Sequence, residues 1–142
     1  MDKSLDQARV SRGTVIEDIF ILYNDGRLIK HSTRRLKPTV DSDVLTSMLV
    51  AVQEFVKDAL KSDERETVDE IKVGEIKIHI IHGRHISVAV LIQGDDVEGI
   101  TRRVRDTLSS VEEKYEGILS SWDGKLSTLN PVVKQIESLF LS

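Results

Sequence analysis

Hydrophobic residues follow a strand-like pattern near the start of this chain. Val15–Tyr23 is a continuous run of β-branched, aromatic and other apolar residues, which predicts a strand buried on both faces. Asn24, Asp25 and Gly26 come next, and Asp-Gly between two strand-like runs predicts a hairpin with Arg27–Thr33 as its returning strand. We therefore expect cover on both sides of the sheet.

A helical period follows. Apolar residues three and four positions apart predict a helix that begins after Asp41 and ends near Leu60. Its stripe consists of Leu45, Met48, Leu49, Val52, Phe55, Val56, Ala59 and Leu60. Val44 and Val50 widen that stripe beyond what one sheet face would cover, which indicates extra core or a face for a partner or a second copy of the chain.

Val68–Val73, Glu75–Ile81 and His85–Ile92 predict three more strands. The turn at Gly83 decides which side chains share a face. A three-residue loop, with Gly83 in a left-handed conformation, would place seven apolar residues on one face, so we predict an odd loop. These residues are Ile76, Ile78, Ile80, Ile86, Val88, Val90 and Ile92.

Two helices end the chain. Gly94-Asp95-Asp96 starts a long amphipathic helix from Val97 to Leu119, and Ser121–Gly124 breaks it. Asn130-Pro131 predicts a last helix with Asn130 as its cap. The order β-β-α-β-β-β-α-α predicts an α+β fold, a five-stranded antiparallel sheet with one helix on one face and two on the other.

Length and composition narrow the function. At 142 residues we expect a flexible arm or linker at 1–13 and a single domain at 14–142. The absence of cysteine favours a cytoplasmic protein, and no apolar run predicts a membrane span. A net charge of −4 and 4% aromatic residues argue against a nucleic-acid binder.

The element order and three segments carry a family resemblance. The segments are the Ile16–His31 hairpin, Thr33–Pro38, and Tyr115 and Leu119 with Trp122–Gly124. The chain resembles the longin and roadblock group of profilin-like folds, in particular small archaeal modules. This implies a non-catalytic regulatory or signalling platform that forms a homodimer and engages small GTPases or other protein partners.

The histidines are the first candidates for chemistry. His79, His82 and His85 are three positions apart around a hairpin, and imidazole is the commonest zinc ligand. The odd loop would point His79 and His85 to one face but offset them along the strands, with His82 in the turn. We therefore expect no metal and no cofactor.

Catalytic motifs are missing as well. Ser87 lies near His79 and His85 in the expected pairing, but there is no G-x-S-x-G elbow and no phosphate-binding loop. Acid pairs, including Glu112 with Glu113, suit helix ends and solvated faces. We therefore predict no catalytic residues and no enzymatic activity.

Two basic clusters remain as candidate binding surfaces. We expect Arg34, Arg35 and Lys37 on a loop, and Arg102 with Arg103 on a helix face, to contact a protein partner. The prediction is thus a non-enzymatic protein-interaction or regulatory module. The alternative is a profilin-like sensor domain that binds a small ligand, as part of a larger signalling protein.

Overall fold

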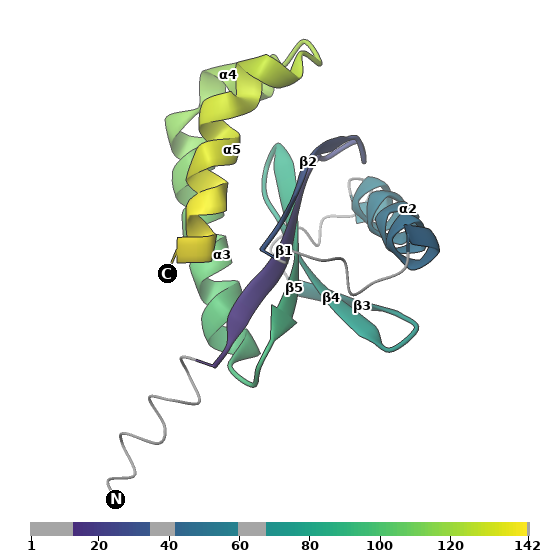
Figure 1. The fold of residues 1–142 in the computed structure, drawn as a ribbon. Helices are drawn as coiled ribbons and strands as arrows, with labels where there is room; N and C mark the ends of the chain where they lie inside the picture. Colours follow the sequence, from purple (N-terminus) through teal and green to yellow (C-terminus); the bar gives the residue numbers. More distant parts are fainter. Residues whose placement is uncertain (1–12, 35–41, 60–67, 142) are drawn as a thin grey trace, which may run out of the picture.

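The computed structural model describes residues 13–34, 42–59 and 68–141. Two strands, one helix, three strands and a final group of helices follow one another along the chain, as predicted (Figure 1). The strands are β1 (Val15–Tyr23), β2 (Leu28–Thr33), β3 (Val68–Val73), β4 (Ile76–His82) and β5 (Ile86–Gln93). The helices are α2 (Ser42–Ala59), α3 (Val97–Lys114), α4 (Glu116–Ser120), α5 (Asn130–Glu137) and the short 3-10 turns η1 (Leu126–Leu129) and η2 (Ser138–Leu141).

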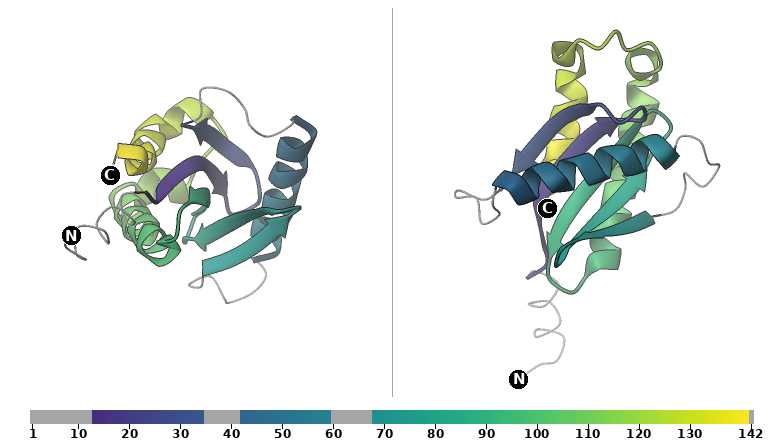
Figure 2. Two further views of the ribbon diagram at one scale, coloured as in Figure 1. Left: turned by 60° about the horizontal axis from the view of Figure 1, so that its bottom comes forward. Right: turned by 90° about the vertical axis from the view of Figure 1, so that its right-hand side faces the viewer.

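The strands form one antiparallel sheet in the order β2-β1-β5-β4-β3. Helix α2 crosses one face of this sheet, and α3, α4 and α5 lie on the other face (Figures 1 and 2). The predicted α+β fold is confirmed. β5 is the central strand, with β1 and β4 on either side of it, so strands far apart in the sequence lie next to each other at the centre of the sheet.

The continuous apolar run of β1 serves two cores. Phe20 and Leu22 pack under α2, whereas Ile19 and Ile21 pack under α3 and α5. Adjacent residues of a strand point to opposite faces, so a strand between two helical layers needs apolar residues at every position. The expectation that both faces of this strand are buried is therefore confirmed.

The predicted parity of the β4–β5 hairpin is wrong. Ile80 pairs with Ala89 and Ile81 with Val88, so even-numbered residues of β4 share a face with odd-numbered residues of β5. Ile78 and Ile80 consequently lie in the α2 core, whereas Val88 and Val90 lie in the other core. Because a helical layer packs on each face of the sheet, the apolar residues of β4 and β5 are divided between the two faces and do not gather on one.

The turn between β4 and β5 also differs from the predicted three-residue loop, because the ladder of paired residues continues beyond His82 and Ser87. Gly83 N donates to Ile86 O at 2.8 Å, which continues the ladder and leaves Arg84 and His85 at the tip. Gly83 does not have a positive φ, in contrast to the predicted left-handed conformation.

Both C-terminal helices depart from their predicted bounds. The long helix expected from Val97 to Leu119 is interrupted at Tyr115, where α3 ends and α4 begins. Asn130 is inside α5 and makes no side-chain cap, because η1 leads directly into the helix and Leu129 takes the capping position. Asp96 does cap α3, accepting a hydrogen bond from Gly99 N at 3.1 Å. The proposed start at Asp41 lies outside the described residues.

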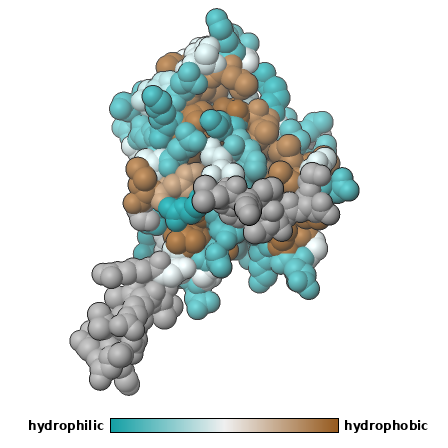
Figure 3. Space-filling view, in the orientation of Figure 1, coloured by the Kyte–Doolittle hydropathy of each residue, from teal (hydrophilic) through white to brown (hydrophobic). Residues whose placement is uncertain are grey.

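The apolar stripe of α2 is wider than its contact with the sheet. Val44 is 36% exposed and Val50 is 53% exposed. They are six positions apart, which places them about 120° apart around the helix. On the face seen in Figure 3, hydrophobic residues occur in groups separated by hydrophilic ones.

Candidate functional site

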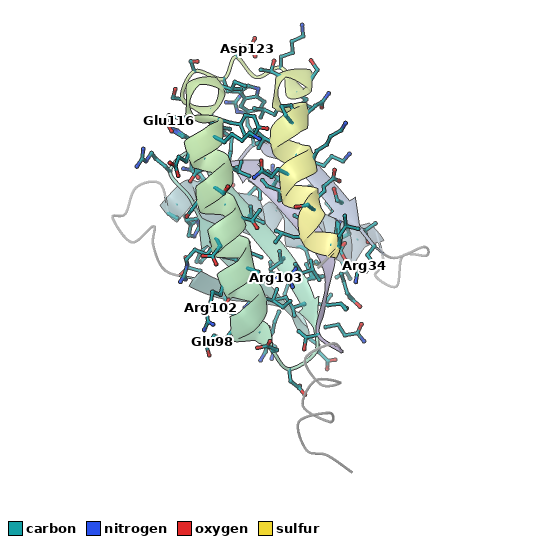
Figure 4. The ribbon with its side chains drawn as sticks, turned by 90° about the vertical axis from the view of Figure 1, so that its left-hand side faces the viewer. Arg34, Glu98, Arg102, Arg103, Glu116 and Asp123 are labelled. Atoms are coloured by element: carbon teal, nitrogen blue, oxygen red, sulfur yellow. The ribbon has the colours of Figure 1, made fainter. Side chains whose placement is uncertain are left out.

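Two of the arginines predicted to bind a partner converge on the C-terminal end of the fold. An Arg34 Nη atom donates to the carbonyl of Phe140, and the guanidinium lies 5.7 Å from the Phe140 ring. Arg103 Nη2 donates to the carbonyl of Leu139 at 2.9 Å and lies between α3 and α5 (Figure 4). Cations at a helix C-terminus satisfy its last carbonyls and favour its dipole. These side chains therefore hold η2 in place.

Arg102 has a different environment from its neighbour. It lies on the side of α3 away from α5 (Figure 4) and makes one long contact, 3.4 Å to Glu98 Oε1. The two side chains are 67% and 88% exposed. Arg35 and Lys37 lie outside the described residues. Of the predicted partner-binding residues that the structure describes, Arg34 and Arg102 are exposed, and Arg102 is the one that does not bond a carbonyl of η2.

The three hairpin histidines each meet a different carboxylate. His79 Nδ1 is 3.8 Å from Glu70 Oε2, and His82 Nε2 is 2.8 Å from Asp69 Oδ2. Nε2 of His85 lies 2.9 Å from Oε2 of Glu116. Because His79 and His82 are three positions apart within β4, they point to opposite faces of the sheet. Within the described residues, no three His, Asp or Glu side chains are placed to hold a metal ion.

Asp69, His82 and Ser87 form a chain that looks like a catalytic triad. His82 Nδ1 lies 3.1 Å from Ser87 Oγ, and its Nε2 faces Asp69. Ser87 is the cross-strand partner of His82, so the even hairpin register brings the pair together. Sequence reasoning missed this group because the predicted odd loop paired other residues.

The hydrogen-bond directions within the Asp69, His82 and Ser87 group do not suit a nucleophilic serine. Asn24 Nδ2 donates to the carbonyls of Gly83 and Arg84, at 3.2 Å and 2.6 Å, so its Oδ1 is an acceptor. The hydroxyl of Ser87 donates to that oxygen at 3.0 Å. Its proton is thus directed to Asn24, whereas a nucleophilic serine passes its proton to the histidine. Ser87 is also fully buried.

Glu112 anchors the tip of the same hairpin to α3. Its carboxylate accepts backbone N–H bonds from Arg84 at 2.7 Å, His85 at 2.5 Å and Ile86 at 3.2 Å. A Cβ at Gly83 would overlap the carboxylate, which explains a glycine at that position. The prediction that this acid belongs to a solvated face is wrong, because Glu112 is only 9% exposed.

A pocket of about 590 Å³ opens between the start of α3 and the outer strands. It is lined by Glu70, His79, Val97, Glu98, Thr101, Arg102 and Arg105. Lys72 and Lys77 pair across β3 and β4 and share the sheet face of Glu70 and His79. We call the exposed side chains of Lys72, Lys77, Arg102 and Arg105 the basic face.

The alternating charged residues of β3 and β4 were the available sequence signal for this face. Glu70 with Lys72, and Lys77 with His79, repeat every second residue on the side opposite the apolar ones. This strand pattern could not indicate that Arg102 and Arg105 of α3 lie beside Glu70 and His79. A strand pattern carries no information about which helix flanks it.

His79 is buried in the pocket lining, as is Thr101. The histidine is 7% exposed, and burial lowers the pKa of the imidazole below its ordinary value, with Lys77 adding to the effect and Glu70 opposing it. Among the described residues it has no hydrogen-bond partner, since Glu70 is too distant at 3.8 Å. An imidazole in this position is available to a ligand.

No protein-family model matches this chain, and no curated protein is significantly similar to it in sequence. No helix in the described part of the chain has both the length and the apolar character needed to cross a membrane.

Proposed function

We propose that this protein is a non-enzymatic interaction module that binds an acidic surface of a protein partner through its basic face. The observation that carries the proposal is that three basic side chains of this face are exposed and unpaired among the described residues. Lys72, Lys77 and Arg105 are exposed, and their side chains have no hydrogen-bond or ion-pair partner among the described residues. On a protein of net charge −4, such a group favours an acidic partner.

The internal use of other polar groups supports the same proposal. Ser87, His82 and Asp69 bond to one another, Arg34 and Arg103 bond to carbonyls, and Glu112 bonds to the hairpin tip. The family resemblance suggests a small GTPase as the partner. With such a partner, the protein would act in regulation or signalling.

Site-specific photo-crosslinking tests the proposal. A photoreactive residue at Lys77 is expected to crosslink one discrete protein in the source cells, whereas the same residue at Ser127, exposed on η1, is not. Binding of the purified partner should weaken with Lys72→Glu and Lys77→Glu but not with Lys134→Glu on α5. Dependence on bound nucleotide would identify a small GTPase. Equal crosslinking at both positions, or insensitivity to charge reversal, would refute the interaction through this face.

A small-ligand sensor is the second candidate, and the pocket itself favours it. Its volume of about 590 Å³ falls within the range of about 300–1,000 Å³ typical of small-molecule sites. A thermal-shift screen separates the candidates, because a ligand that binds only the native state raises the melting temperature.

A further inference from the structure

The pocket between α3 and the outer strands has a buried polar floor. The side chain of His79 is 9% exposed and makes no hydrogen bond within the described chain. Its ring nitrogens can therefore donate or accept a hydrogen bond with a group that enters the pocket. The floor therefore favours a ligand with a hydrogen-bonding group.

Two guanidinium groups stand beside this floor. Arg102 and Arg105 line the pocket from the first turns of α3, three residues apart and on the same side of the helix. Their planar N–H groups match the geometry of carboxylate and phosphate oxygens. Lys77 adds a further positive charge close enough to affect His79. These positive charges beside the pocket therefore favour an anionic ligand.

Two carboxylates compete with such a ligand. Glu98 bonds Arg102 at 3.4 Å, and Glu70 lies 3.8 Å from His79. Both are at least half exposed, with 88% of the Glu98 side chain and 51% of the Glu70 side chain accessible. Exposed pairs of this kind stabilise a protein little, so an incoming anion can displace them. The occupied pocket would exchange these weak internal contacts for charge-assisted hydrogen bonds.

We propose that this pocket binds one oxyanion group, a carboxylate or a phosphate, through the guanidinium groups of Arg102 and Arg105 and the imidazole of His79. The inference rests on the proposed function only in that the pocket lies within the basic face. The oxyanion belongs either to a small free ligand or to an acidic segment of the partner.

Titration of the full chain with three probes tests the site. The probes are inorganic phosphate, succinate and a short glutamate peptide, and the readout is the ring resonances of His79. At least one probe is expected to saturate. The variants Arg102→Gln and Arg105→Gln should weaken that binding about tenfold each. Arg84→Gln, which removes an exposed arginine on the hairpin tip, should leave it unchanged.

A gain-of-function variant keeps the test independent of folding. Glu98→Gln releases Arg102 from its competitor and should tighten binding about threefold. Saturation by phosphate or succinate identifies a free ligand, and saturation by the peptide alone identifies a partner segment. No saturable binding of any probe, or unchanged affinity in both arginine variants, overturns the site. That failure is distinct from failure of the proposed function, which is measured by crosslinking at Lys77.

Discussion

The Nε2 atom of His82 lies 2.8 Å from Oδ2 of Asp69, so a buried imidazole of β4 is bound to the edge strand β3. The other ring nitrogen faces Ser87 of β5, and the Phe55 ring of α2 stacks on the imidazole with centroids 6.2 Å apart. Asn24 joins the group from the β1–β2 turn. This polar group therefore ties the edge strand, both hairpins and α2 together, which is a structural task.

Replacing Ser87 with alanine should destabilise the fold by about 1–3 kcal/mol. The substitution leaves Asn24 Oδ1 and His82 Nδ1 without their hydroxyl partner inside the protein. Urea unfolding monitored by circular dichroism measures the change. Ser109→Ala, at an exposed position of α3, is the control and should change stability by less than about 0.5 kcal/mol. Equal stability of the two variants would contradict a structural role for the hydroxyl.

His79 should make stability depend on pH. Because burial holds its pKa below the ordinary value of 6.5, the unfolded chain binds a proton at higher pH than the native protein does. The contribution of His79 is therefore unchanged above about pH 7.5 and becomes destabilising as the pH falls toward about pH 5. Unfolding free energies of the native chain and of His79→Gln should diverge over this window, with the native chain losing more. Parallel curves would show that His79 is not desolvated.

Arg103 should stabilise the C-terminal end of the fold. Its guanidinium donates to the carbonyl of Leu139, and removal of this bond in Arg103→Gln is expected to cost about 1–2 kcal/mol. Hydrogen exchange at η2 should accelerate at the same time. The neighbouring Arg102→Gln is a matched control, since its exposed pair with Glu98 contributes about 0–1 kcal/mol. Identical effects of the two substitutions would argue against the capping role.

Self-association stays a prediction of the wide apolar stripe on α2. Val50 is 53% exposed on that helix, and a homodimer formed across it should dissociate when Val50 is replaced by glutamate. Light scattering at several protein concentrations gives the mass. A native chain that is monomeric throughout, or a dimer that persists in Val50→Glu, would rule out α2 as the interface.

Periodicity predicted most of the elements correctly. The run Val15–Tyr23 and the stripe of α2 correspond to elements with almost the expected bounds. The local sequence was sufficient to predict these two elements, because each has one strong apolar pattern. The interruption at Tyr115 was not predicted, because the apolar spacing continues through it into α4.

The candidate site was much less accessible to sequence reasoning. Arg102 and Arg103 are adjacent in the sequence, yet one faces solvent and the other binds the C-terminal carbonyls. Their roles differ because adjacent helical residues point about 100° apart. Arg34 joins Arg103 from a distant strand end, a proximity that no local pattern encodes.

The sequence by itself determined which segments are strands and helices and that the sheet is covered on both faces, because side-chain periodicity and turn chemistry are local properties. Tertiary structure decided the register of the β4–β5 hairpin, and with it the partners of His79, His82 and Ser87. Two helical layers demand apolar residues on both faces, so packing set the parity. The same packing placed α3 beside the outer strands and brought Arg102 and Arg105 to His79.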